Sequence, residues 1–197
     1  MTKFEKLDNL LRESNGYLQT AQVLKEGISK PTLAAYVRDR GMDHVAQGVY
    51  LAKDGWEDSL YQLQLLNRKA VYSHETALHL QGLMEREPRN ISCTVPAGYN
   101  ATHLRKRGIQ VFQVKAETYE LGKREVITAF GNTVIAYDRE RTICDILKHK
   151  EKMDIQIFQY AIKAYMASNE KNLHRLIMYA KQMKVEALVR TYTEVLL

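Results

Sequence analysis

The sequence contains few of the residues that mark specialised protein classes. Its 197 residues include only 2 cysteines, 3 prolines and 10 glycines, which excludes a disulfide framework, a cysteine-rich zinc site and a collagen-like chain. No apolar run approaches the ~18 residues that a membrane span requires, and the first residues lack the apolar stretch of a secretory signal. We therefore expect a cytoplasmic protein with no membrane partner.

What is present is an ordinary globular composition with a basic balance. Hydrophobic residues make up 45% of the chain and charged residues 26%, which is enough for a sizeable core. The net charge of +6 favours a polyanionic partner. Residues 1–55 hold eight Lys/Arg against seven Asp/Glu, so most of the positive excess lies in residues 56–197. Bulk charge therefore does not locate a nucleic-acid interface.

The first three predicted helices follow the order of a helix-turn-helix. Apolar residues recur at helical spacing over residues 3–13. Thr20 is expected to cap a second, short helix with Leu24 facing inward, and Ser29 a third helix that ends near Arg40. The turn between the last two helices is only residues 27–29, and so short a turn forces them to cross at a steep angle.

A hairpin and a boundary complete this first part. Apolar runs on either side of Gln47-Gly48 predict two paired strands joined by a tight turn, at the position of a wing. Asp54-Gly55 follows and is the expected boundary. The sequence thus predicts a winged helix-turn-helix DNA-binding domain over residues 1–55.

Residues 56–197 predict an α+β domain with a small sheet and a C-terminal helical bundle. Alternating apolar residues favour strands over 91–95, 109–114, 125–130 and 133–137. Helical spacing is found at 57–67, after the caps Ser73 and Asp138, and throughout the last ~45 residues. The fold class of the whole chain is therefore predicted to be α+β.

The third predicted helix is the candidate for entry into the major groove of DNA. Residues at its start can meet base edges or phosphates, and arginines farther along can grip guanine or hold phosphates. The predicted DNA-binding residues, including those at the end of the second helix and in the hairpin, are Lys25, Ser29, Lys30, Thr32, Tyr36, Arg38, Arg40, Gln47 and Lys53. The alternatives are a solvated helix face with ordinary charges and a protein-interaction module of the same shape.

The densest basic run lies outside this domain. Arg105, Lys106 and Arg107 are consecutive and are candidates for additional contacts with nucleic acid. The alternative is the solvated end of a helix.

Other polar clusters lack the spacing that catalysis or metal binding requires. His74 and His79 stand five residues apart, not at the i, i+4 spacing of a helical zinc pair. Asp138 is explained as a helix cap, and Arg141 with Asp145 as an i, i+4 ion pair. The two cysteines have no activating base beside them. We predict no catalytic residue, no metal and no cofactor.

Taken in order, several short motifs resemble those of the AbiEi antitoxins of bacterial abortive-infection, type IV toxin–antitoxin systems. Residues 47–50 (QGVY) are similar to the family's wing motif, and residues 72–78 (YSHETAL) to its S-x-x-x-A-L stretch. Residues 138–145 (DRERTICD) resemble its ERT-x-x-D segment, and residues 161–165 and 176–180 fit its tail. Gln47 stands where the family often has Arg, a departure that weakens the expected phosphate contact at the wing tip.

The resemblance implies two functions for one chain. The N-terminal domain would bind double-stranded promoter DNA of its own operon and repress transcription. The C-terminal domain would counter a nucleotidyltransferase-like toxin without forming a stable complex with it. The resemblance also implies a role in phage defence.

Two other classes of protein remain open at this point. The first is a ligand-sensing winged-helix transcription factor, which a large apolar pocket in the second domain would favour. The second is an enzyme with a DNA-tethering domain, which a carboxylate or histidine pair within hydrogen-bond reach would favour.

Overall fold

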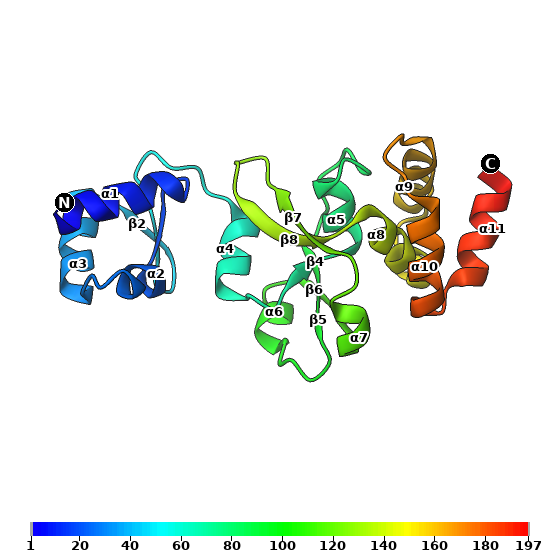
Figure 1. Ribbon diagram of the computed structural model, residues 1–197, viewed down its shortest axis with the longest axis horizontal. Coiled ribbons are helices and arrows are strands. Elements are labelled where there is room, and N and C mark those ends of the chain that lie inside the picture. Colours follow the sequence, from blue (N-terminus) through cyan, green and yellow to red (C-terminus); the bar gives the residue numbers. More distant parts are fainter. Residues whose placement is uncertain (1, 197) are drawn as a thin grey trace. The chain divides into compact units, whose positions relative to one another are not determined.

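The computed structural model describes residues 2–196 and shows a mixed α+β structure (Figure 1). The described residues form eleven α-helices and two small sheets, and they divide into two compact units. Unit 1 comprises the residues up to Arg68 together with Ile127–Val134. Unit 2 comprises Lys69–Val126 and the residues from Ile135 onward. No helix within residues 2–196 is both long and apolar enough to cross a membrane.

Unit 1 combines four helices with a three-stranded antiparallel sheet of strand order β1-β3-β2. Its elements are α1 (Lys3–Glu13), β1 (Tyr17–Gln19), α2 (Thr20–Lys25), α3 (Lys30–Asp39), β2 (Asp43–Ala46), β3 (Val49–Leu51) and α4 (Ser59–Leu66). The core of the first three helices is apolar and almost fully buried, with Leu7, Leu18, Val23, Ile28, Leu33 and Tyr36 at its centre. Burial of these side chains holds the short elements together.

The start of α2 differs from the sequence expectation. Thr20 is the first residue of the helix and not its cap, and the capping residue Gln19 makes no side-chain hydrogen bond. Leu24, expected to face inward, is 42% exposed. Because α2 has only six residues, Val23 on the helix and Ile28 just after it fill the core position. Strand β1 is too short at three residues for an alternating pattern to predict.

Unit 1 extends beyond the boundary expected at Asp54-Gly55. Helix α4 follows that point, and its Tyr61 and Leu65 pack against a buried cluster of the small sheet formed by Tyr17, Val49 and Leu51. The Tyr17 hydroxyl also accepts the backbone N–H of Asp58 at 2.8 Å. The residues of α4 therefore pack with the first unit, and the compact unit ends after Arg68.

Asp58 holds residues 127–134 in unit 1. The residue is 1% exposed, and its Oδ2 accepts the Thr128 hydroxyl at 2.6 Å and the Asn132 amide at 2.8 Å. Its Oδ1 accepts the N–H of Tyr61 at 3.0 Å and so caps α4. Asn15 adds a bond from its side-chain amide to the carbonyl of Gly131. These bonds explain why a segment distant in sequence belongs to the first unit.

Unit 2 contains most of a mixed five-stranded sheet of order β6-β5-β4-β8-β7. The strands are β4 (Val71–Tyr72), β5 (Ser92–Pro96), β6 (Gln110–Val114), β7 (Lys123–Ile127) and β8 (Thr133–Tyr137). β5 and β6 run parallel, whereas β4 is antiparallel to β5 and parallel to β8. The alternation of apolar residues does not predict β4, because two residues are too few to show a period.

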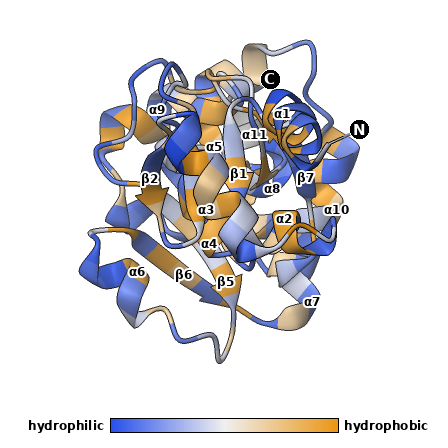
Figure 2. Ribbon diagram, turned by 90° about the vertical axis from the view of Figure 1, so that its left-hand side faces the viewer, coloured by the Kyte–Doolittle hydropathy of each residue, from blue (hydrophilic) through white to orange (hydrophobic). Residues whose placement is uncertain are grey.

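Helices supply the larger core of unit 2. They are α5 (His74–Leu80), α6 (Thr102–Lys106), α7 (Ala116–Tyr119), α8 (Arg139–Lys148), the 3-10 turn η1 (Lys150–Lys152), α9 (Ile155–Ala167), α10 (Leu173–Met183) and α11 (Glu186–Leu196). Buried residues of α5, α8, α9 and α10 form one continuous apolar cluster. In Figure 2, β6 has both hydrophobic and hydrophilic stretches, whereas its neighbour α6 is largely hydrophilic. The predicted α+β class of the chain is thereby confirmed.

Candidate nucleic-acid interface

Helix α3 buries one face and exposes the other. Leu33 and Tyr36 point into the core of unit 1. The exposed residues form adjacent pairs that recur about every fourth residue and therefore lie on one side of the helix. They are Lys30, Pro31, Ala34, Ala35, Arg38 and Asp39. A cation stands at each end of this α3 face and two alanines lie between them, so a partner can approach the helix backbone closely.

The turn before α3 fixes how the helix begins. Gly27 adopts φ +72°, a conformation that favours glycine. Ile28 is 2% exposed and pins the turn to the core, and the side chain of Ser29 accepts the N–H of Thr32. The hydroxyls of Ser29 and Thr32 also lie 2.9 Å apart, so these two predicted DNA contacts bond each other.

Two exposed cations lie on the α3 face, and two more lie elsewhere in unit 1. They are Lys25 at the end of α2, Lys30 and Arg38 on α3, and Lys53 after β3. Within residues 2–196, none of the four forms a salt bridge. Cations without an intramolecular partner are available to displace the counterions of a phosphate backbone.

Two of the predicted DNA-binding residues have other roles in the structure. Tyr36 is fully buried, donates its hydroxyl to Asp8 at 2.6 Å and meets the Phe4 ring edge-on. Burial, together with the neighbouring carboxylate, raises the pKa of Tyr36 to about 12. Arg40 lies 3.0 Å from the same Asp8 carboxylate. Tyr36 is therefore a core residue, contrary to the prediction, because the 3.6-residue period of α3 turns it toward α1.

The β2–β3 turn presents the predicted wing residues. Gln47 is exposed at its tip, and Gly48 adopts φ +69°. The Gly48 carbonyl accepts the N–H of Thr20 at 2.8 Å, which ties the turn to the start of α2. His44 is exposed and its ring lies 5.2 Å from that of Tyr50. The second basic run, residues 105–107, is also exposed but belongs to unit 2.

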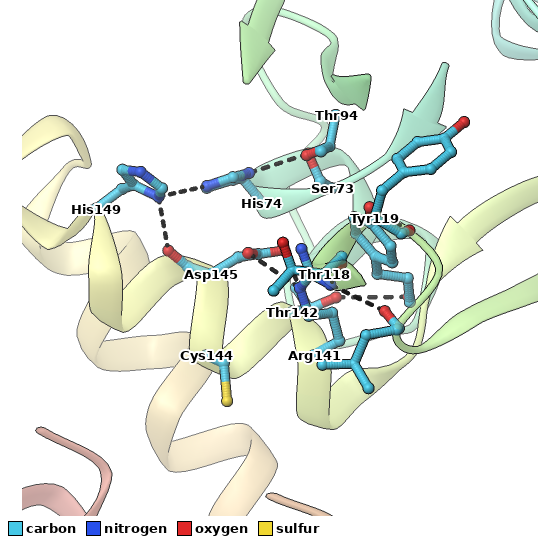
Figure 3. Close-up of polar contacts among 12 residues, drawn as sticks. Ser73, His74, Thr94, Thr118, Tyr119, Arg141, Thr142, Cys144, Asp145 and His149 are labelled. Atoms are coloured by element: carbon cyan, nitrogen blue, oxygen red, sulfur yellow. Dashed lines mark hydrogen bonds and ion pairs between the residues drawn. The ribbon is translucent and has the colours of Figure 1, made fainter. Parts of the chain in front are cut away.

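Unit 2 contains a buried polar chain that the sequence does not predict (Figure 3). The Thr94 hydroxyl donates to Ser73 Oγ at 2.9 Å, and Ser73 Oγ lies 3.0 Å from His74 Nδ1. His74 Nε2 lies 3.0 Å from His149 Nδ1, which also contacts the carbonyl of Asp145 at 3.1 Å. A carbonyl only accepts, so His149 Nδ1 carries the proton and His74 Nε2 accepts.

The environment keeps the His74 ring neutral. The residue is 2% exposed, and Phe112 stacks on the ring with 3.5 Å between centroids. Burial lowers the pKa of His74 well below its usual value, and the charge of neighbouring His149 lowers it further. Burial also lowers the pKa of His149. No sequence signal joins the two histidines, since 75 residues separate them.

Helix α8 confirms the expected cap and ion pair, and both are buried. Asp138 caps the helix by accepting the N–H of Arg141 at 2.8 Å, and it also accepts the Tyr179 hydroxyl. Arg141 Nε lies 3.2 Å from both carboxylate oxygens of Asp145. The guanidinium also donates to two backbone carbonyls and covers the ring of Tyr137 at 4.1 Å. These contacts account for Asp138, Asp145 and most of the Arg141 guanidinium, whose Nη2 is buried without a hydrogen-bond partner among the described residues.

The two cysteines do not join the polar chain as nucleophiles. Cys93 and Cys144 are both fully buried, and burial raises the pKa of each thiol to about 12. In Figure 3 the Cys144 side chain points away from the histidines. Within the described part of the chain, no three His, Cys, Asp or Glu side chains form a group able to hold a metal ion.

The sequence and the structure were compared with known proteins. No family model and no curated protein matches the chain. Among solved structures, the chain is similar to that of the RV2827C protein from Mycobacterium tuberculosis, with 12% identity and a TM-score of 0.47. The match covers 98% of this chain and 81% of the other.

Proposed function

We propose that the chain is a DNA-binding antitoxin of the AbiEi type, and that unit 1 is a winged helix-turn-helix. The element order α1, β1, α2, α3, β2, β3 supports this assignment, with α3 as the recognition helix and the β2–β3 hairpin as the wing. In this proposal unit 1 binds the promoter of its own operon and represses transcription.

The observation that carries the DNA-binding proposal is the α3 face. It is exposed, it lacks bulky side chains between its two cations, and Arg38 and Lys30 have no salt-bridge partner among the described residues. An alanine on a recognition helix can contact a thymine methyl group, and an arginine can hold guanine or phosphate. The face also carries one carboxylate, Asp39 at the end of α3, which lies 3.8 Å from Arg40 Nε.

An affinity measurement tests this part of the proposal. The full chain should bind a duplex taken from directly upstream of its own gene more tightly than a scrambled duplex of equal length. Arg38→Ala should weaken binding roughly tenfold, the effect of about 1–3 kcal/mol for one specific contact. Lys3→Ala removes an equal charge from exposed α1 and should change affinity less than twofold. Equal affinities of the two variants would remove α3 from the interface.

For unit 2 we propose the antitoxin activity, in the cytoplasm and without catalysis or a stable toxin complex. The support is the AbiEi-like motifs of this unit at residues 72–78 and 138–145, which follow in order the wing motif of unit 1 at residues 47–50. A nucleotidyltransferase gene beside this one would identify the toxin. Co-expression of the two proteins should restore growth, and growth arrest in the presence of folded chain would contradict the proposal.

One observation favours a second candidate, an enzyme tethered to DNA. His74 and His149 form a histidine pair at 3.0 Å, and Ser73 lies at the same distance from His74. Against it, Ser73 and His74 are buried and Phe112 covers the imidazole. Ser73→Ala in folded chain separates the two candidates: toxin protection persists if the chain is a non-catalytic antitoxin and disappears if Ser73 is a nucleophile.

A further inference from the structure

A groove with a volume of about 430 Å³ lies on unit 2. Its walls come from four places that are distant in sequence: the start of α5, the loop before β5, the turn between α6 and β6, and the turn between η1 and α9. That volume falls within the range of small-molecule sites. The groove is separate from the α3 face and does not depend on the DNA-binding proposal.

Charged side chains of both signs line the groove without pairing. The cations are Arg86, Arg89, Arg105 and Lys152, and the carboxylates are Glu75, Glu87 and Asp154. None of the seven forms a salt bridge with another described residue. Burial raises the pKa of Glu75, repulsion from Asp154 adds to the rise, and Arg89 offsets it only in part. The described charges of the groove therefore form no ion pair with one another, although Arg89 acts on Glu75 from a longer distance.

An apolar surface accompanies these charges. Ile109 is 6% exposed, and Pro88 and Ile157 are half-buried along the same groove. Gly108 stands beside Ile109 at φ +77°, and a Cβ at that position would meet no atom within 4 Å, so the turn leaves open space. A flat apolar group can lie against this surface while polar groups reach the charges around it.

We propose that this groove binds a small phosphorylated ligand of the nucleoside phosphate class. The four cations would hold phosphate oxygens, for which arginine is well suited because its guanidinium makes two parallel hydrogen bonds. Glu75 and Asp154 would accept hydrogen bonds from hydroxyl or amino groups, and Ile109 would contact the ring. A continuous nucleic-acid backbone fits less well, because the groove has a volume of only about 430 Å³, which is that of a small-molecule site.

Titration calorimetry of the full chain tests this inference with four probes: the nucleoside triphosphates, inorganic pyrophosphate, adenosine and a single-stranded RNA 12-mer. Saturable binding is expected for at least one triphosphate, weaker binding for pyrophosphate, and the weakest for adenosine. Arg105→Gln and Lys152→Gln should each weaken triphosphate binding at least tenfold. The matched controls Arg107→Gln and Lys150→Gln change exposed neighbours that do not line the groove, and they should stay within twofold.

Three results would overturn the inference. The first is an absence of saturable binding of every triphosphate and of pyrophosphate. The second is equal affinity of the Arg105→Gln and Arg107→Gln variants for the triphosphate. The third is tighter binding of the RNA 12-mer than of any triphosphate with the same dependence on Arg105, which would assign the groove to nucleic acid. All four substituted side chains are exposed, so we expect each variant to keep the fold, and a difference in affinity then reports on ligand contacts.

Discussion

Replacing Asp58 by alanine should destabilise unit 1 more than any surface change in that unit. The side chain caps α4 through Tyr61 and holds Thr128 and Asn132, both of which are buried. Removing it therefore eliminates one helix cap and leaves two buried donors without their acceptor.

The size of the effect follows from these contacts. Loss of a cap costs about 0.5–2 kcal/mol, and a hydrogen bond to a charged group contributes about 1.5–3 kcal/mol. Because water will hydrogen-bond in part to the two donors that lose Asp58, we expect the free energy of unfolding to fall by about 3–5 kcal/mol in total. That is a large share of the stability of a domain.

Urea unfolding of the full chain measures this loss, followed by the fluorescence of Trp56, the single tryptophan of the sequence, which lies in unit 1. A double-mutant cycle with Thr128→Val isolates the Asp58–Thr128 bond, and its coupling energy should be about 1.5 kcal/mol or more. A loss below about 1 kcal/mol for Asp58→Ala, or a coupling energy near zero, would refute the reasoning that Asp58 holds residues 127–134 in unit 1.

Three further predictions concern other residues. Because burial lowers the pKa of His74, the unfolded chain binds more protons than the folded one below pH ~6.5, and the free energy of unfolding should fall by about 1.4 kcal/mol for each pH unit of acidification. His74→Asn, which tolerates the observed φ of +49°, should flatten this dependence of stability on pH. Urea unfolding at several pH values measures the slope, and an unchanged slope in the variant would contradict the prediction. Gly122→Ala should cost about 2–4 kcal/mol, since its φ is +77° and a Cβ would lie 2.7 Å from that of Arg141. The control Gly98→Ala has a similar φ, but its Cβ would meet no atom within 4 Å. Equal decreases of the melting temperature in the two variants would show that the contact with Arg141 does not contribute. Tyr36→Phe should lower stability by about 0.5–1.5 kcal/mol and leave DNA affinity unchanged, whereas lost DNA affinity at constant stability would return Tyr36 to the interface.

Local sequence signals predict the parts of the fold that local physics determines. Ser29, Asp138 and the 3.6-residue periods of α3 and α8 are read from a few neighbouring residues, and the structure confirms them. The sequence interpretation is wrong at Tyr36, whose burial depends on which side of α3 the residue occupies. The polar hydroxyl of Tyr36 suggests that this side chain faces solvent, but its place in the helical period turns it toward Asp8 on α1.

Contacts between distant segments account for what the sequence could not predict. Asp58 bonds residues more than sixty positions away, which extends unit 1 past Asp54-Gly55. His74 meets His149 across 75 residues, and no spacing rule covers such a pair. The groove of unit 2 likewise gathers charges from four separate segments, of which only Arg105 belongs to a visible basic run.

A salt titration of DNA binding tests the central claim, that the α3 face and its neighbouring cations form the interface. Four phosphate contacts from Lys25, Lys30, Arg38 and Lys53 predict a slope of about −3 to −4 for the logarithm of the association constant against that of salt concentration. The double variant Lys30→Ala/Arg38→Ala should reduce the magnitude of this slope by about 2, whereas Lys3→Ala should leave it unchanged. A slope in the double variant equal to that of the natural chain would contradict the claim.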